Sequence, residues 1–175
     1  ELIKAAARID PALDVQVDII GGGEMKQKLR ELAASLGVTD RIHFLGKLSD
    51  EDLRATLTRG TVFAMPSRAE LQCIAAMEAM ATALPVVAAN AMALPHLVHD
   101  GVNGHLYEPG DIDGFAAALT DVLTATPARL DKMKNASLEV VAHHAMGHTL
   151  DVFEALYRGD PVADRVADPG SKPAG

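Results

Sequence analysis

Short apolar runs alternate along this chain with segments of helical periodicity. Residues 15–20, 41–46, 61–65 and 85–89 each have the length and aliphatic or β-branched content of a buried strand. Between one run and the next, turn or capping residues lead into a stretch that favours a helix. Strands joined through helices in this way pair in parallel, because a parallel pair needs a crossover connection. The pattern therefore predicts an α/β, Rossmann-like fold with a mainly parallel sheet and helices on both faces.

The composition is that of one domain with an aliphatic core. The chain has 175 residues, of which 49% are hydrophobic but only 3% aromatic, and it has no Trp. A net charge of −8 argues against a nucleic-acid or anionic-membrane surface. One cysteine cannot form an internal disulfide, which makes a cytoplasmic location the expectation. No apolar run approaches 18 residues, so we expect no transmembrane segment.

The two ends of the chain suggest where the domain lies. The sequence opens within a helical pattern that has no capping residue before it, so we expect a piece of a longer protein. Residues 1–158 carry the alternating pattern and are predicted to form the domain. Residues 159–175 are polar, with several Pro and Gly, and are predicted to be a disordered tail.

The third apolar run leads into the stretch with the clearest chemical signal. Pro66 ends the run at residues 61–65, and a helix is predicted to follow directly. The first amides of that helix have no intrahelical partner and can receive a phosphate or another anion. On this interpretation the anion-binding amides belong to four residues: Leu71, Gln72, Cys73 and Ile74.

Two carboxylates flank this predicted anion site. Glu70 and Glu78 are eight residues apart, which corresponds to roughly 12 Å along a helix. That separation is too large for a shared proton and suits the two ends of an extended ligand. The apolar residues Ile74, Met77 and Ala81 predict a largely buried helix, where an unpaired Glu78 would be costly.

A glycine loop follows the first apolar run. Glycine lets a ligand approach the backbone closely, and three consecutive glycines occur here. The loop lacks the third spaced glycine of a dinucleotide fingerprint, so a tight turn explains it equally well. The candidate ligand-binding residues of this loop are Gly21 and Gly23.

Residues 66–88 carry a family resemblance. They read P-S-x-x-E, then a second Glu after seven intervening residues, then E-A-M-A-T-A-L-P-V-V-A. This resembles the donor nucleotide-binding domain of retaining GT-B glycosyltransferases of the glycogen-synthase-like superfamily (glycosyltransferases group 1, family 4). The resemblance spans about residues 12–158 and implies one half of a GT-B fold.

The resemblance also implies roles for individual residues. Glu70 would lie by the donor sugar as the catalytic residue, and the amides of residues 71–74 would hold the diphosphate. Glu78 would bind the ribose hydroxyls. Gly21 and Gly23 would border the nucleotide cleft, and the loop with Lys47 and Leu48 would lie beside the base.

The function that the resemblance implies belongs to a longer chain. This domain would bind a UDP-, GDP- or ADP-sugar, and a hexose would pass with retention to an acceptor held by an N-terminal domain. Neither a metal nor another cofactor is expected, and by itself the chain is expected to be inactive. The absent domain could place the enzyme peripherally at the inner membrane face. Two alternatives stay open: a non-catalytic nucleotide-binding module, and a GT-B sugar-nucleotide epimerase or phosphorylase.

Three positions depart from the family pattern. Cys73 and Ala83 stand where many members have Gly, and His96 stands where an acid is frequent. A side chain at residue 73 narrows the space above the helix start. No metal site is expected. The polar residues within 49–52 and 111–113 are predicted to cap helices, and the histidines at 143, 144 and 148 lack converging ligands.

Overall fold

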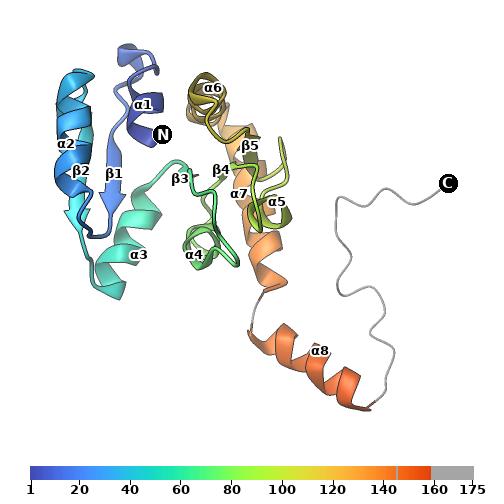
Figure 1. The fold of residues 1–175 in the computed structure, drawn as a ribbon. Helices are drawn as coiled ribbons and strands as arrows, with labels where there is room; N and C mark the ends of the chain where they lie inside the picture. Colours follow the sequence, from blue (N-terminus) through green and yellow to red (C-terminus); the bar gives the residue numbers. More distant parts are fainter. Residues whose placement is uncertain (145, 159–175) are drawn as a thin grey trace.

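The computed structural model describes residues 1–144 and 146–158, and these form alternating strands and helices (Figure 1). The predicted tail at 159–175 lies outside the described residues. The strands are β1 (Val17–Ile20), β2 (Ile42–Gly46), β3 (Phe63–Met65), β4 (Val86–Ala89) and β5 (Gly104–Tyr107). The α-helices are α1 (Leu2–Ala6), α2 (Lys26–Ser35), α3 (Asp50–Arg59), α4 (Ile74–Ala81), α5 (Leu94–Leu97), α6 (Ile112–Leu123), α7 (Pro127–Ala142) and α8 (Met146–Arg158). Two 3₁₀ turns, η1 (Pro11–Leu13) and η2 (Thr39–Arg41), precede β1 and β2.

Every strand pairing is parallel, as the alternation of elements predicts. β1 pairs with β2, and β3, β4 and β5 form a second sheet in that order. The α/β class and the parallel pairing are confirmed, but the single expected sheet is divided in two. Within the described residues, no strand pairs with both β1 and β3, so no backbone ladder joins the two sheets.

Helices cover both faces of the larger sheet. All four residues of β4 are fully buried, which requires packing on each side. α4 contacts β3, β4 and α7, whereas α6 contacts β4, β5 and α1. The main core gathers residues from these elements around β4, and Phe115 is its largest fully buried side chain.

A second, smaller core belongs to the β1–β2 sheet. Ala33 of α2 and Ile42 of β2 pack there with Ile3 and Ala6 of α1. Ala5 of the same short helix instead joins the main core. Helix α1 therefore packs into both cores and lies between α2 and α6 (Figure 1).

Capping residues set several helix ends where the sequence predicts them. The Ser49 hydroxyl accepts from the Asp52 amide at 3.1 Å and starts α3. Asp111 accepts from the Gly114 amide at 2.9 Å and starts α6. Both are N-cap hydrogen bonds, so Ser49 and Asp111 are capping residues, as expected.

The turn before β5 depends on a buried asparagine and a glycine. Asn103 is fully buried, and its side chain accepts from the His99 amide and donates to the Leu97 carbonyl. Gly104 has φ +155°, and a Cβ atom there would lie 1.8 Å from the carbonyl oxygen of Val86. Only glycine fits at this position, because β5 and β4 approach each other too closely for a side chain.

Helix α4 ends in a Schellman motif that has alanine in the glycine position. The Ala83 amide donates to the Met80 carbonyl at 2.9 Å, and the Leu84 amide donates to the Ala79 carbonyl at 3.1 Å. Ala83 has φ +61°, in the left-handed region that favours glycine. The sequence departure at this position therefore coincides with backbone strain.

We expect Ala83→Gly to stabilise the protein by about 1 kcal/mol. The left-handed conformation costs an alanine about 1–2 kcal/mol, and glycine's greater freedom in the unfolded chain offsets part of the gain. Ala81→Gly, on the exposed side of the same helix, is the control and should destabilise by about 1 kcal/mol. Urea unfolding of both variants tests this, and equal effects at the two positions would contradict it.

Helix α4 differs from the prediction at its start and on its surface. It begins at Ile74, so the amides of Leu71 and Gln72 precede the helix. Its buried residues are Ala76, Ala79 and Met80. The other predicted face, with Ile74, Glu78 and Ala81, is exposed. The expected burial of Glu78 is wrong because the helix turns the face with Ala76, Ala79 and Met80 toward the core, and Glu78 lies on the other face.

The described helices also bear on the prediction that no segment crosses a membrane. None of those in residues 1–144 and 146–158 combines the length and the apolar content needed to span a bilayer.

Candidate functional site

The loop between β3 and α4 places the predicted anion-binding amides in an unusual backbone conformation. Cys73 is the N-cap of α4 and has φ +50° and ψ +60°. This left-handed residue turns the chain immediately before the helix and so delays the helix start to Ile74. The family pattern that residues 66–88 resemble has glycine at this position, and the left-handed conformation explains why glycine suits it.

The amides that precede and open α4 are unpaired. Among the described residues, no hydrogen bond is donated by the amides of residues 71–75, whereas the Ala76 amide donates to the Cys73 carbonyl at 3.0 Å. Leu71 and Ile74 are 79% and 60% exposed, so this surface is open. The free amides that open α4, together with those of Leu71 and Gln72 just before it, form a site suited to a diphosphate or a similar anion.

Glu70 and Glu78 lie on either side of the first turn of α4. Glu70 is half-buried in the loop, and its carbonyl accepts from the Ala93 amide at 3.2 Å. Glu78 lies on the exposed face of the helix. Because Glu70 is outside the helix, the separation of roughly 12 Å expected from helical rise does not apply. Both side chains are accessible to a ligand.

The glycine loop and the loop that carries Lys47 lie together. The Gly21 amide donates to the Gly46 carbonyl at 2.7 Å, and a Cβ atom at Gly22 would lie 3.9 Å from Cγ of Lys47. Gly21, with φ +122°, follows the carboxyl end of β1, and Lys47 follows that of β2. In open α/β sheets, ligands bind outside the carboxyl ends of the strands.

The predicted site residues therefore form two groups. Gly21, Gly23, Lys47 and Leu48 belong to the β1–β2 sheet, and residues 70–78 belong to the β3–β5 sheet. No hydrogen bond joins the two groups within residues 1–144 and 146–158. A ligand that contacts both groups would span the division between the two sheets.

Cys73 is not suited to be a nucleophile. Its side chain is buried, and burial raises the pKa of the thiol. The Ala76 amide opposes that shift, and the Glu70 carboxylate adds to it. A nucleophilic cysteine needs a lowered pKa, because the thiolate is the reactive form.

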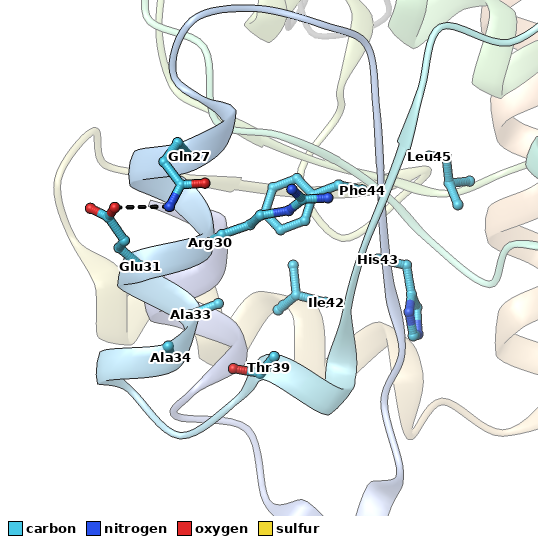
Figure 2. A pocket seen from close by; sticks show the side chains of 10 residues that line it. All are labelled: Gln27, Arg30, Glu31, Ala33, Ala34, Thr39, Ile42, His43, Phe44 and Leu45. Carbon is cyan, nitrogen blue, oxygen red and sulfur yellow. Dashed lines mark hydrogen bonds between the residues drawn. The ribbon is translucent and has the colours of Figure 1, made fainter.

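A cavity of about 640 Å³ lies elsewhere, between α2 and β2 (Figure 2). The Arg30 guanidinium stacks over the Phe44 ring at 5.6 Å, and Gln27 donates to Glu31 at 2.9 Å. No predicted site residue lines this cavity. We assign the site to the strand-end loops instead, because the free amides and accessible carboxylates are there. The cavity is lined by Gln27, Arg30, Glu31, Ala33, Ala34, Thr39, Ile42, His43, Phe44 and Leu45.

The described residues contain no cluster of side chains that could hold a metal ion. Within residues 1–144 and 146–158, no three His, Cys, Asp or Glu side chains converge as a metal site would require.

One set of contacts at the site has no counterpart in the sequence analysis. Arg68, two residues before Glu70, donates to the Glu1 carboxylate at 2.5 Å. The other oxygen of Glu1 accepts from the Tyr107 hydroxyl at 2.8 Å. Because these partners are 67 and 106 residues apart in sequence, no local pattern reveals the pairing.

Comparison with known proteins identifies the family. The sequence model of the family described as Glycosyl transferases group 1 matches residues 1–139. This chain is a group 1 glycosyl transferase domain. The family resemblance of residues 66–88 is thereby confirmed, and so is the expected half of a GT-B fold.

Two relatives of this glycosyl transferase domain have assigned activities. It is 37% identical to a D-inositol 3-phosphate glycosyltransferase of Mycolicibacterium vanbaalenii, covering 95% of the chain and 38% of that protein. It is 34% identical to an MMP alpha-(1->4)-mannosyltransferase of Mycolicibacterium hassiacum, covering 87% of the chain and 38% of the relative. The chain thus spans less than two fifths of each of these proteins.

Solved structures show the same fold. Anabaena HepE in complex with UDP-glucose is 26% identical and has a TM-score of 0.78, with 90% of this chain and 44% of that chain covered. The pneumococcal O-GlcNAc transferase GtfA in complex with UDP and GlcNAc is 21% identical and has a TM-score of 0.77, with 90% and 32% covered.

Proposed function

We propose that this group 1 glycosyl transferase domain is the donor-binding half of a retaining glycosyltransferase that transfers a hexose from a nucleotide diphosphate sugar. The observation that carries the proposal is the row of free amides at residues 71–75, flanked by Glu70 and Glu78. The likeness to HepE, whose structure holds UDP-glucose, supports a nucleotide-sugar donor. Among the possible donors we favour a UDP-sugar over a GDP- or ADP-sugar for that reason.

The proposed chemistry is electrostatic. The free amides would bind the diphosphate and stabilise the negative charge that grows on it as the sugar departs. Glu70 would lie by the hexose, and Glu78 would accept hydrogen bonds from the ribose hydroxyls. Gly21, Gly23, Lys47 and Leu48 would border the base. We propose that no metal or other cofactor takes part.

The rest of the proposal concerns the longer protein. The acceptor would bind to an N-terminal domain of the same protein, and the reaction would take place in the cleft between the two. The lone cysteine supports a cytoplasmic location. The chain by itself is proposed to bind donor without turnover, because positioning of the acceptor supplies a large share of catalysis.

The full-length protein tests the proposal. We expect one nucleoside diphosphate among UDP, GDP and ADP to bind in the micromolar range by calorimetry, and the matching hexose donor to support transfer. NMR of the product should show the anomeric configuration of the donor. An inverted product would contradict retention, and the absence of binding to all three diphosphates would contradict the site itself.

A further inference from the structure

The loop that carries Glu70 has few backbone attachments. Across residues 66–72, one backbone hydrogen bond connects the loop to another segment, from the Ala93 amide to the Glu70 carbonyl at 3.2 Å, in the part of the chain that the structure describes. A loop with so few backbone bonds needs other contacts to hold a reacting carboxylate in place.

Arg68 supplies such a contact. Its guanidinium donates to the Glu1 carboxylate at 2.5 Å and lies against Gly110, where a Cβ atom would come within 3.2 Å of Nη2. The side chain of Glu1 is 18% exposed, whereas that of Arg68 is 58% exposed. The arginine therefore reaches from the open loop to an anchor that is mostly covered.

The anchor is fixed in turn by the core. The Tyr107 hydroxyl donates to the second carboxylate oxygen of Glu1 at 2.8 Å. Tyr107 is 4% exposed and stacks on the fully buried Phe115, with ring centroids 4.1 Å apart and an interplanar angle of 8°. Its carbonyl also accepts from the Asn90 amide at 2.8 Å. The tyrosine is thus held at its ring, its hydroxyl and its backbone.

The protonation states fit this arrangement. Burial would raise the pKa of Glu1, but hydrogen bonds from Arg68 and Tyr107 outweigh it and lower the pKa below the ordinary value. Glu1 is therefore a carboxylate at neutral pH and accepts both bonds. Burial and the neighbouring Glu1 raise the pKa of Tyr107, which keeps its hydroxyl a donor.

We propose that Glu1 and Arg68 are positioning residues for the donor site: they transmit the rigidity of Tyr107 to the β3–α4 loop and so hold Glu70 in place. The inference rests on the proposed function, since it assigns Glu70 to the reacting sugar. It adds Glu1 and Arg68 as residues that act by positioning Glu70 and need not contact the donor themselves.

The test uses the full-length protein with Glu1→Gln, Arg68→Gln and the double variant. Each single change should lower kcat by about 10- to 100-fold, because a shift of about 1 Å in a reacting group has effects of that size. The Kd of the bare nucleoside diphosphate should change by less than about 2-fold, which corresponds to a small fraction of its binding free energy. The kcat of the double variant should fall no further than that of the worse single variant, since Glu1 and Arg68 belong to one chain of contacts.

Two further variants separate positioning from general destabilisation. Arg68→Lys keeps the charge and should restore part of kcat, although it loses the planar fork. Arg129→Gln is the control, because it breaks another arginine–carboxylate ion pair, with Asp121, away from the loop. Its kcat should equal that of the wild type.

Hydrogen exchange gives a readout that does not depend on turnover. The Ala93 amide donates to the Glu70 carbonyl and reports whether the loop keeps its place. Its exchange should be at least about 10-fold faster in Glu1→Gln and Arg68→Gln, and unchanged in Arg129→Gln. Unchanged Ala93 exchange in both loop variants would overturn the inference, even if the protein transferred no sugar.

A different pattern would assign Arg68 another role. If Arg68→Gln strongly lowered the affinity for the diphosphate while Glu1→Gln did not change it, Arg68 would bind the sugar nucleotide directly. The positioning inference would then be wrong. If the wild type transferred no sugar but Ala93 exchange responded as expected, the proposed function would fail and the anchoring of the loop would stand.

Discussion

In the full-length protein, Glu70→Gln is expected to lower the turnover number by about 100- to 1,000-fold, the range measured when one charge-stabilising group is removed from an active site. Glu70 is half-buried in the β3–α4 loop beside the free amides, where the donor's hexose would lie. A loss confined to the transition state appears in kcat, so the affinity for the bare diphosphate should be nearly unchanged.

Steady-state rates and calorimetry with the nucleoside diphosphate measure the two effects separately. Glu51→Gln is a suitable control, since Glu51 is an exposed carboxylate on α3 and belongs to neither half of the site. If Glu70→Gln lowered the affinity for the diphosphate by the same factor as it lowered kcat, Glu70 would bind the nucleotide rather than the sugar.

Glu78→Gln is expected to act on affinity instead. A carboxylate that accepts hydrogen bonds from ribose hydroxyls contributes about 1.5–3 kcal/mol, which corresponds to a loss of roughly 10- to 150-fold. Because the diphosphate and the intact donor both contain the ribose, the affinity of the protein for each should fall by the same factor. The exposed position of Glu78 makes its carboxylate available, and no buried partner has to be displaced.

Glu139→Gln provides the comparison for Glu78. Glu139 is also an exposed glutamate in the interior of a helix, but it lies on α7. Titration calorimetry of both variants should show a change only at Glu78. If the two variants bound the diphosphate equally well, the ribose assignment would be refuted.

The sequence predicts much of the fold because many of its signals are local. Hydrophobic runs locate the strands, and the caps at Ser49 and Asp111 form the hydrogen bonds that their residue types favour. The start of α4 is not predictable in the same way. It depends on a left-handed conformation at Cys73, which residue type alone disfavours and only the surrounding structure imposes.

The site likewise has a part that the sequence predicts and a part that depends on the tertiary fold. Glu70, Glu78 and the amide-bearing residues follow from spacing and family resemblance, and the structure leaves the two carboxylates accessible. The Arg68, Glu1 and Tyr107 contacts depend on segments brought together only by the tertiary fold. The buried face of α4 also depends on the tertiary fold: Ala76 and Met80 pack in the main core, and Ala79 packs with Leu57 and Leu84.

The division between the two sheets bears on how the domain unfolds. Each sheet has its own core, and α1, only five residues long, contributes to both. Cooperative unfolding requires that the loss of one region destabilise the other. Here that coupling passes through the buried side chains of α1 and through α3, whose Leu57 packs with Ala79 and Leu84 in a third small cluster. The β1–β2 unit, with the smaller core, is therefore the part that can open while the rest stays folded. A donor bound to both Lys47 and Glu78 would contact both units, and its binding would make their unfolding more cooperative.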